Sequence, residues 1–175
     1  VQTQSRDQRT LVLWRVDAAS GAAQPLVTER SDTWVELHDE LGFLPRARQI
    51  VWASSRSGQR HLYLLDYSGR ELRPLTAGDW GVLGDDRGRA IRGIDEARGR
   101  IYFMANRETP LERHLYAASL RGTGDPANPT RLTLRQGWHS VAMSRDARRW
   151  LETFSDPDTP PSLSLRSVDG GRAVE

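Results

Sequence analysis

The sequence predicts an all-β fold, a partial β-propeller of four-stranded antiparallel blades with about two whole blades and two partial ones. The first observation is a set of short runs, rich in aromatic and branched aliphatic residues, that glycine-containing turns separate. The second is that the same order of runs and turns recurs roughly every 50 residues, which is typical of propeller blades. The third is that proline and glycine recur too closely to leave a long helical period.

The clearest copy of the repeat lies between Ile50 and Trp80. Ser-Gly pairs divide it into short runs, and Gly78 closes it. Glycine supplies the positive φ angles of tight hairpins, so the runs are expected to form an antiparallel meander. The three predicted strands are Ile50–Ala53, His61–Asp66 and Arg73–Thr76.

A second copy begins at Ile101–Met104, which corresponds to Ile50–Ala53. The spacing between equivalent residues grows along the unit, from 53 residues between His61 and His114 to 58 residues between Trp80 and Trp138. This growth predicts small insertions in the second copy, one of them in the loop over residues 122–129.

Partial copies flank these two. Leu11–Asp17 with Gln24–Val27 matches the second and third strands of the unit, and Trp150–Phe154 with Ser162–Leu165 matches the first and second. The chain is therefore divided as one propeller fragment, 1–175, into a partial blade 1–30, a blade 31–77, a blade 78–135 and a partial blade 136–175. The alternative is a plain antiparallel sandwich in which the internal similarity is accidental.

The segments between the copies are assigned from their polarity and turn residues. Residues 1–9 are expected to end an upstream strand, and residues 81–92 to form a loop before a short strand with Ile91 and Ile94. Residues 32–37 are expected to begin the second blade, followed by Leu41, Phe43 and Leu44 in the core. Residues 155–161 are expected to be a proline-rich crossing loop, and residues 167–175 the start of an outer strand.

Length and composition exclude several classes. With 175 residues, the chain is too short for a closed seven- or eight-bladed propeller, and with Val at position 1 it has the character of an excised piece. All 25 basic residues are arginines, interspersed with 23 acidic residues to a net charge of +2, so no nucleic-acid patch is expected. There is no cysteine, no apolar run long enough to span a membrane and no signal peptide.

Motifs that would indicate catalysis, metal binding or phosphate binding are weak in this sequence. His61 and His114 occupy equivalent repeat positions and are expected to bond neighbouring backbone groups rather than a metal, which needs three or four converging ligands. No Gly-x-Ser-x-Gly elbow or phosphate-binding loop occurs, and the adjacent carboxylate pairs lie in turn-like segments. The six tryptophans are expected to serve mostly as core residues. No cofactor and no metal site is predicted.

Several motifs together resemble the N-terminal β-propeller of the dipeptidyl-peptidase IV family, serine peptidases of the prolyl oligopeptidase clan. The resemblance in general sequence character is greatest to the bacterial members. The similarity extends from about Val1 to the C-terminus, and the motifs stand in the family's order. They are Trp34-Val35-Glu36, the turn Trp52–Gly58, Arg60-His61-Leu62-Tyr63, Leu75-Thr76-x-Gly78-x-Trp80-x-Val82, Tyr102-Phe103-x-Ala105-Asn106 and Arg113-His114-Leu115-Tyr116.

The resemblance limits which functional residues are expected in this chain. The family's Ser-Asp-His triad belongs to a C-terminal α/β-hydrolase domain, and its Asp-Trp-x-x-Glu-Glu motif for the substrate amino group is absent here. In some members, the segment after the Trp34 equivalent lines an outer substrate pocket with aromatic and basic residues. Here that segment reads His38-Asp39-Glu40, so only His38 and Asp39 are carried over, as residues at the pocket edge.

The resemblance implies a non-catalytic propeller segment of a serine dipeptidyl peptidase that releases X-Pro or X-Ala dipeptides. The segment would wall the active-site chamber and restrict access to peptide N-termini, with the hydrolase domain of the same parent chain and peptide substrates as partners. It also implies a bacterial periplasmic or exported protein. An open arc of blades is expected to self-associate into a homo-oligomer. The alternatives are a stand-alone propeller module for protein or carbohydrate binding, and a scaffold in a catalytically dead relative.

Overall fold

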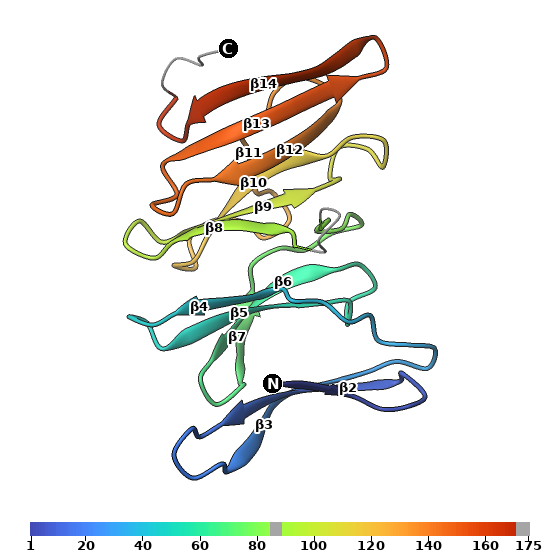
Figure 1. Ribbon diagram of the computed structural model, residues 1–175, viewed down its shortest axis with the longest axis vertical. Helices are drawn as coiled ribbons and strands as arrows, with labels where there is room; N and C mark the ends of the chain where they lie inside the picture. Colours follow the sequence, from blue (N-terminus) through green and yellow to red (C-terminus); the bar gives the residue numbers. More distant parts are fainter. Residues whose placement is uncertain (85–88, 171–175) are drawn as a thin grey trace.

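The computed structural model describes residues 1–84 and 89–170, and in this part of the chain it contains strands but no helix. The strands form four separate antiparallel sheets that follow one another along the chain (Figure 1). The sheets do not close into a ring, so the predicted all-β, partial β-propeller is confirmed. Each sheet is called a blade below.

Within every blade the strands follow chain order, so each strand is joined to the next strand of its blade by a hairpin. Blade 1 holds β1 (Gln2–Gln4), β2 (Thr10–Val16) and β3 (Ala23–Arg30). Blade 2 holds β4 (Leu41–Leu44), β5 (Gln49–Ser54), β6 (His61–Asp66) and β7 (Glu71–Pro74). Blade 3 holds β8 (Ile91–Asp95), β9 (Arg100–Ala105), β10 (His114–Ser119) and β11 (Thr130–Arg131). Blade 4 holds β12 (Trp138–Met143), β13 (Arg149–Asp156) and β14 (Thr159–Ser167).

The two middle blades bury both of their faces. Successive side chains of a strand point to opposite faces, so Ile50 and Trp52 of β5 pack toward blade 1 while Val51 and Ala53 pack toward blade 3. The same alternation in β9 sends Phe103 to the blade 2 side and its neighbours to the blade 4 side. Burying a large apolar side chain is worth roughly 1.5–3 kcal/mol, so the interfaces between blades hold the arc together.

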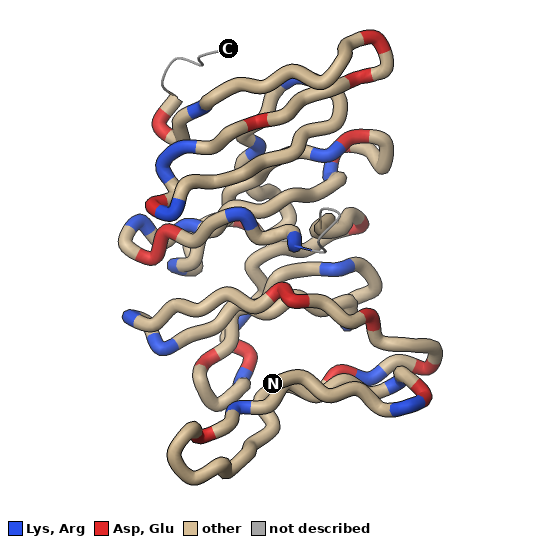
Figure 2. The backbone as a smooth tube through the Cα atoms, viewed as in Figure 1, with Lys and Arg blue, Asp and Glu red and all other residues tan. Residues whose placement is uncertain are grey.

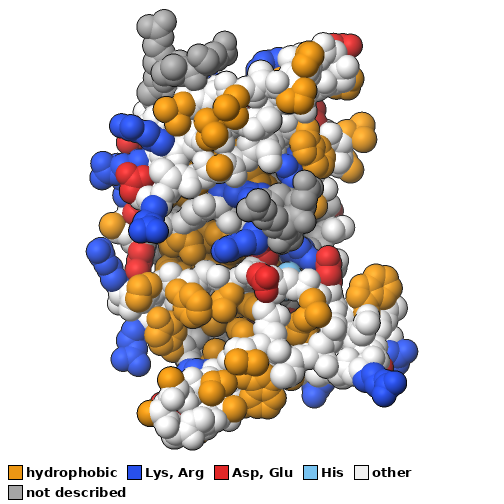
Figure 3. Space-filling view, viewed as in Figure 1, with side chains coloured by type: hydrophobic (Ala, Val, Ile, Leu, Met, Phe, Trp, Pro, Cys, Tyr) orange, Lys and Arg blue, Asp and Glu red, His pale blue; other side chains and the backbone are white. Residues whose placement is uncertain are grey.

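The far side of blade 4 remains open. Leu151 and Leu165 are paired across β13 and β14 and are each 42% exposed, and Leu163 is 55% exposed. In Figure 3, hydrophobic side chains reach the surface over the lower, middle and upper parts of the arc. The apolar surface is therefore not confined to the interfaces between blades.

Four expectations for individual segments need correction. Phe43 is 63% exposed because alternation along β4 places it on the opposite face from buried Leu44. Residues 155–161 form the tight β13–β14 hairpin. Pro157 lies in its turn, and Pro160 and Pro161 lie on β14, an edge strand that can do without their N–H groups. Residues 32–37 form no strand, and the first strand of blade 2 begins at Leu41. Among the tryptophans, Trp52, Trp80 and Trp150 are buried, whereas Trp34 and Trp138 are exposed.

Two predicted segments extend beyond the described residues. The loop expected over residues 81–92 includes positions 85–88, and the outer strand expected over residues 167–175 includes positions 171–175.

Candidate functional site

The register of blades 2 to 4 defines two rims. One, the histidine rim, carries His61, His114 and His139 at or near strand ends. The other, the hairpin rim, carries the turns after β4, β8 and β12 and lies on the left side of Figure 1. Residues expected to contact substrate belong to the histidine rim, because the segment with His38 and Asp39 leads into the start of β4.

The connection from β3 to β4 is extended and is held by the polar side chains of β1. Gln4 donates from Nε2 to the carbonyl of Val35 at 2.6 Å, and Gln2 donates from Nε2 to the carbonyl of His38 at 3.0 Å. Trp34, directly before the first of these tied residues, is left 65% exposed. Blade 1 therefore positions the segment that enters blade 2.

His38 turns its ring inward. The ring lies against that of Trp52, with centroids 4.6 Å apart, and Nδ1 accepts the backbone N–H of Glu40 at 3.2 Å. Burial, and then the nearby Arg60 cation, lower the pKa of His38 to about 4. The ring is therefore neutral near pH 7 and offers an uncharged, partly apolar wall.

A pocket of about 320 Å³ opens beside His38, between blades 1 and 2. Its arginines are paired with carboxylates, and the pair of Arg56 with Glu29 joins the two blades. Arg56 bonds Glu29 at 2.6 Å and Glu71 at 2.7 Å, and Arg60 bonds Glu36 at 2.6 Å. The pocket thus combines an exposed indole, a neutral imidazole and guanidinium–carboxylate pairs, a set suited to holding a polar peptide segment.

Asp39 is separated from that pocket. It is exposed and lines a shallow neighbouring pocket of about 330 Å³ together with Val1, Gln2, Leu13 and Leu41. His38 lines both pockets, so the two residues predicted for the substrate-pocket edge share the shallow pocket, and only His38 reaches the pocket beside Trp34. Arg56 and Arg60 were missed, although both stand in motifs that carried the family resemblance.

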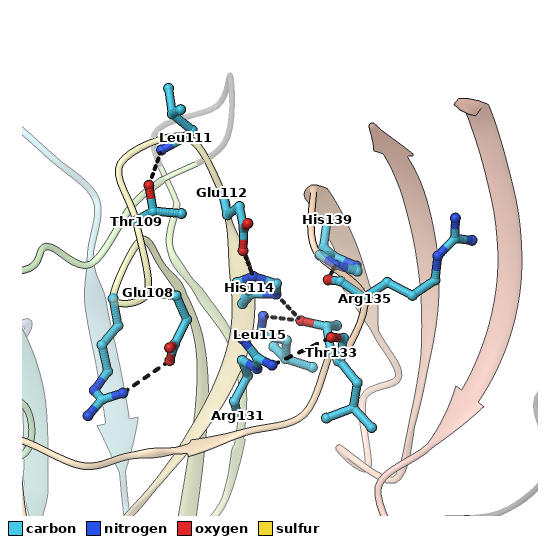
Figure 4. A network of polar contacts seen from close by, with 12 residues as sticks. Glu108, Thr109, Leu111, Glu112, His114, Leu115, Arg131, Thr133, Arg135 and His139 are labelled. Carbon is cyan, nitrogen blue, oxygen red and sulfur yellow. Dashed lines mark hydrogen bonds and ion pairs between the residues drawn. The ribbon is translucent and has the colours of Figure 1, made fainter. Parts of the chain in front are cut away.

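His61 and His114 form a repeated histidine–threonine pair. His61 Nδ1 lies 3.0 Å from Thr76 Oγ1, and His114 Nδ1 lies 3.0 Å from Thr133 Oγ1 (Figure 4). Each threonine oxygen also accepts the backbone N–H of the residue after the histidine, at 2.9 and 3.0 Å. The repeated Leu-Thr of the sequence was the signal for these partners.

In both His61 and His114, the partner of the second ring nitrogen, Nε2, determines the tautomer. His61 Nε2 faces the carbonyl of Gly78 at 3.0 Å, and His114 Nε2 faces the Glu112 carboxylate at 2.8 Å. Both Nε2 atoms must donate, so Nδ1 accepts the threonine hydroxyl proton in the neutral ring. Burial lowers the pKa of both histidines, although Glu112 opposes this for His114. The predicted backbone bond is confirmed for His61 and wrong for His114.

His139 occupies the corresponding rim of blade 4 with different partners. Its Nδ1 lies 2.8 Å from Glu152 Oε1 and its Nε2 lies 2.9 Å from the carbonyl of Arg135. Both ring nitrogens therefore face acceptor oxygens. Burial disfavours ionisation of Glu152, but His139 and Arg166 outweigh it and lower its pKa to about 2.

These histidines do not form a nucleophilic site. The two threonine hydroxyls are buried, and each is engaged by a backbone N–H and a ring nitrogen. The His114 and His139 rings approach to 4.9 Å, yet the described residues contain no group of three or more His, Cys, Asp or Glu side chains able to hold a metal ion. No described helix is long and apolar enough to cross a membrane. The geometry supports binding and inter-blade stabilisation.

Comparisons with known proteins agree with this architecture. Residues 1–161 match the model of the family described as the dipeptidyl peptidase IV (DPP IV) N-terminal region. The chain is 27% identical over 194 residues to dipeptidyl peptidase 8 of Mus musculus, covering 94% of this chain and 21% of that protein. It is 29% identical over 186 residues to a probable dipeptidyl-aminopeptidase B of Emericella nidulans, covering 99% of this chain and 20% of that protein.

A crystal structure of Porphyromonas gingivalis dipeptidyl peptidase 4 has the same fold over all of this chain and 24% of that one, with a TM-score of 0.85 at 24% sequence identity. The chain thus spans about a fifth of the length of the curated relatives described above.

Proposed function

This chain belongs to the family of dipeptidyl peptidase IV N-terminal regions, and from that premise we propose that it is a non-catalytic propeller segment of a serine dipeptidyl peptidase. The observation that carries the proposal is the family match over residues 1–161. The fold agrees with it, because the described residues form propeller blades and no other kind of domain. The parent enzyme would release N-terminal X-Pro or X-Ala dipeptides, with its triad in a C-terminal α/β-hydrolase domain.

The histidine rim is the face proposed to wall the chamber above that hydrolase domain. The pocket of Trp34, His38, Arg56 and Arg60 would contact the peptide, because it joins an exposed aromatic surface to donors that bind backbone carbonyls and carboxylates. Its ion pairs keep the long side chains in place before the peptide arrives, which reduces the entropy lost on binding. Asp39 would lie at the outer edge of this surface.

Peptidase activity tests the central proposal. The purified 175-residue chain should not hydrolyse a Gly-Pro reporter, whereas the protein encoded by the complete reading frame should. Turnover by the chain alone, or a reading frame with no hydrolase sequence after residue 175, would overturn the assignment.

The rim pocket is tested separately in the full-length enzyme. Trp34→Ala and His38→Gln are expected to raise KM for a peptide substrate several-fold while leaving kcat nearly unchanged, because they remove binding that is equal in ground and transition states. Leu72→Ala on β7 is the control, since Leu72 is partly exposed but lies outside the pocket. Unchanged KM in both rim variants would remove the pocket from substrate binding.

Self-association is also proposed for the isolated chain. The open side of blade 4 exposes Leu151, Leu163 and Leu165 in one paired patch. Contiguous apolar surface of this kind is unfavourable in water, and a second copy would cover it.

A further inference from the structure

Four arginines line a cleft at the hairpin rim, and the proposed peptidase function does not involve them. The cleft has a volume of about 340 Å³ and lies between blades 2 and 3. Its basic side chains are Arg73, Arg98, Arg100 and Arg121, and its one acidic side chain is Asp125. Figure 2 shows arginines at the hairpins on this side of the arc.

The cleft is distinct from the substrate pocket proposed above. Its walls are β7, the turn between β8 and β9, the end of β10 and the loop over residues 121–130. By strand register, the blade 3 walls lie at the opposite end of that blade from His114, whereas Arg73 lies on the outer strand of blade 2. No residue lines both this cleft and the substrate pocket. Both walls belong to blades with neighbours on each side, so the open outer faces of blades 1 and 4 do not create it.

Two of the arginines are anchored by backbone carbonyls and lie close against glycines that have positive φ. Arg73 donates from Nη2 to the carbonyl of Leu120, and a Cβ on Gly122 would lie 2.5 Å from Arg73 Nη1. Arg121 donates from Nη2 to the carbonyl of Ala97, and a Cβ on Gly99 would lie 2.4 Å from Arg121 Nε. Each guanidinium is therefore held in place by one donor and retains other N–H groups for a ligand.

The positive charge of the cleft is only partly neutralised within the described residues. Arg98 approaches Asp95 at 3.8 Å and Asp169 at 3.5 Å, but Arg73, Arg100 and Arg121 form no ion pair with any carboxylate of residues 1–84 and 89–170. Asp125 is turned to its own loop, where it accepts from the Ala127 N–H and the Asn128 side-chain amide. Partial burial lowers the pKa of Arg73, as expected for a cation without a counter-charge.

The loop that closes the cleft is tied to the neighbouring blade. The carbonyl of Pro126 accepts the backbone N–H of Ala77 at 3.0 Å, and the Ser119 and Thr123 hydroxyls lie 3.0 Å apart at the cleft wall. This loop is also the insertion that the growing repeat spacing indicated in the sequence. Blade 2 has only a short turn at the equivalent place, between β6 and β7.

We propose that this cleft binds a small, multiply charged oxyanion, with a phosphate group as the chemistry that fits its walls. Guanidinium groups bind phosphate with paired N–H donors, and converging arginines in a concave site strengthen the local positive field. The volume suits a small molecule rather than a polymer. The group can be free phosphate or the phosphate of a small ester, since both present the same oxygens.

Calorimetric titration of the full chain with inorganic phosphate, at constant ionic strength against chloride, tests the proposal. Saturable one-site binding is expected. Arg100→Gln and Arg121→Gln should each weaken it about tenfold, the usual effect of losing a charge-assisted hydrogen bond. Arg100 is exposed and makes no described ion pair, so its variant should fold normally. Arg46→Gln removes the same charge from an exposed turn at the same rim and is the matched control.

Each outcome decides the assignment. Loss of affinity in the two cleft variants, with Arg46→Gln unchanged, supports it. Heats that do not saturate, or equal weakening in all three variants, overturn it, because the effect is then a general property of a basic rim. Glycerol 3-phosphate in place of phosphate separates the sources: equal affinity identifies the free anion and tighter binding identifies an ester. The result is independent of whether the parent protein is a peptidase.

Discussion

The Glu152 carboxylate is expected to make the largest single contribution to the pH dependence of stability. Its pKa falls from 4.5 to about 2, and each unit corresponds to 1.36 kcal/mol, so the ionised form stabilises the folded chain by on the order of 3 kcal/mol. A depressed pKa gives stability that is complete above pH 4.5 and is lost as the pH falls towards 2. Glu152→Gln should therefore lower the free energy of unfolding by about 3 kcal/mol at pH 7.

Urea unfolding followed by tryptophan fluorescence, repeated between pH 2.5 and pH 7, measures this effect. The variant should also lose most of the decline below pH 4.5 that the parent shows. Glu36→Gln is the control, because it makes the same chemical change in an exposed ion pair with Arg60 and should cost at most about 1 kcal/mol. A Glu152→Gln variant with the parent's stability at pH 7 and the parent's pH profile would refute the reasoning.

Three further predictions concern a contact between blades, a contact within blade 3 and self-association. Glu40→Ala should cost about 2–4 kcal/mol, because the buried backbone N–H groups of Ala90 and Ile91 lose their acceptors, whereas Glu96→Ala at an exposed turn should cost less than about 1 kcal/mol in the same urea assay. Thr133→Val should cost about 1–3 kcal/mol through loss of the bonds to His114 and Leu115, and Thr133→Ser should restore most of it; equal melting temperatures for the two variants would contradict the role of the hydroxyl. Leu163→Glu should shift the chain towards monomer in light scattering while Leu111→Glu, in an isolated exposed position, should not; identical masses would remove the blade 4 face from self-association.

The histidine rim links stability to the proposed function. Each of blades 2 to 4 places a histidine at this rim, and each ring is held by partners from its own blade or the adjoining turn. These bonds fix the strand ends from which the loops of the rim extend. A rigid rim would position the pocket beside His38 without being part of any reaction.

Local features of this protein were determined by short stretches of sequence. The segments Ser5–Arg9 and Ser144–Arg148 read SRDQR and SRDAR, and they form the same turn. In both, the serine hydroxyl donates to the aspartate, at 2.5 and 2.7 Å, and the fourth residue has a positive φ, 59° and 53°. All partners lie within a few residues of one another, so the pattern fixes the structure without help from the rest of the chain.

The repeat itself predicted the blades for a similar reason. Alternating aromatic and aliphatic residues between glycine turns specify strands, and strands joined by short hairpins pair with their neighbours in sequence. The strands around Ile50, His61 and Ile101 were therefore predictable. The exposure of the Phe43 side chain was not predictable, because the neighbouring blade determines whether a side chain on an edge strand is covered.

Which distant residues come into contact follows only from the packing of the blades. His38 and Asp39 are adjacent in sequence, yet contact with Trp52 turns one inward while the other faces solvent beside β1. Arg73 and Arg121 are separated by a whole blade in sequence, and only the packing of blade 2 against blade 3 brings them into one cleft. Strands, turns and family could be predicted from the amino-acid sequence, because these depend on neighbours along the chain. Both candidate binding surfaces depend on side chains from different blades, whose distances follow from the packing of one sheet on the next.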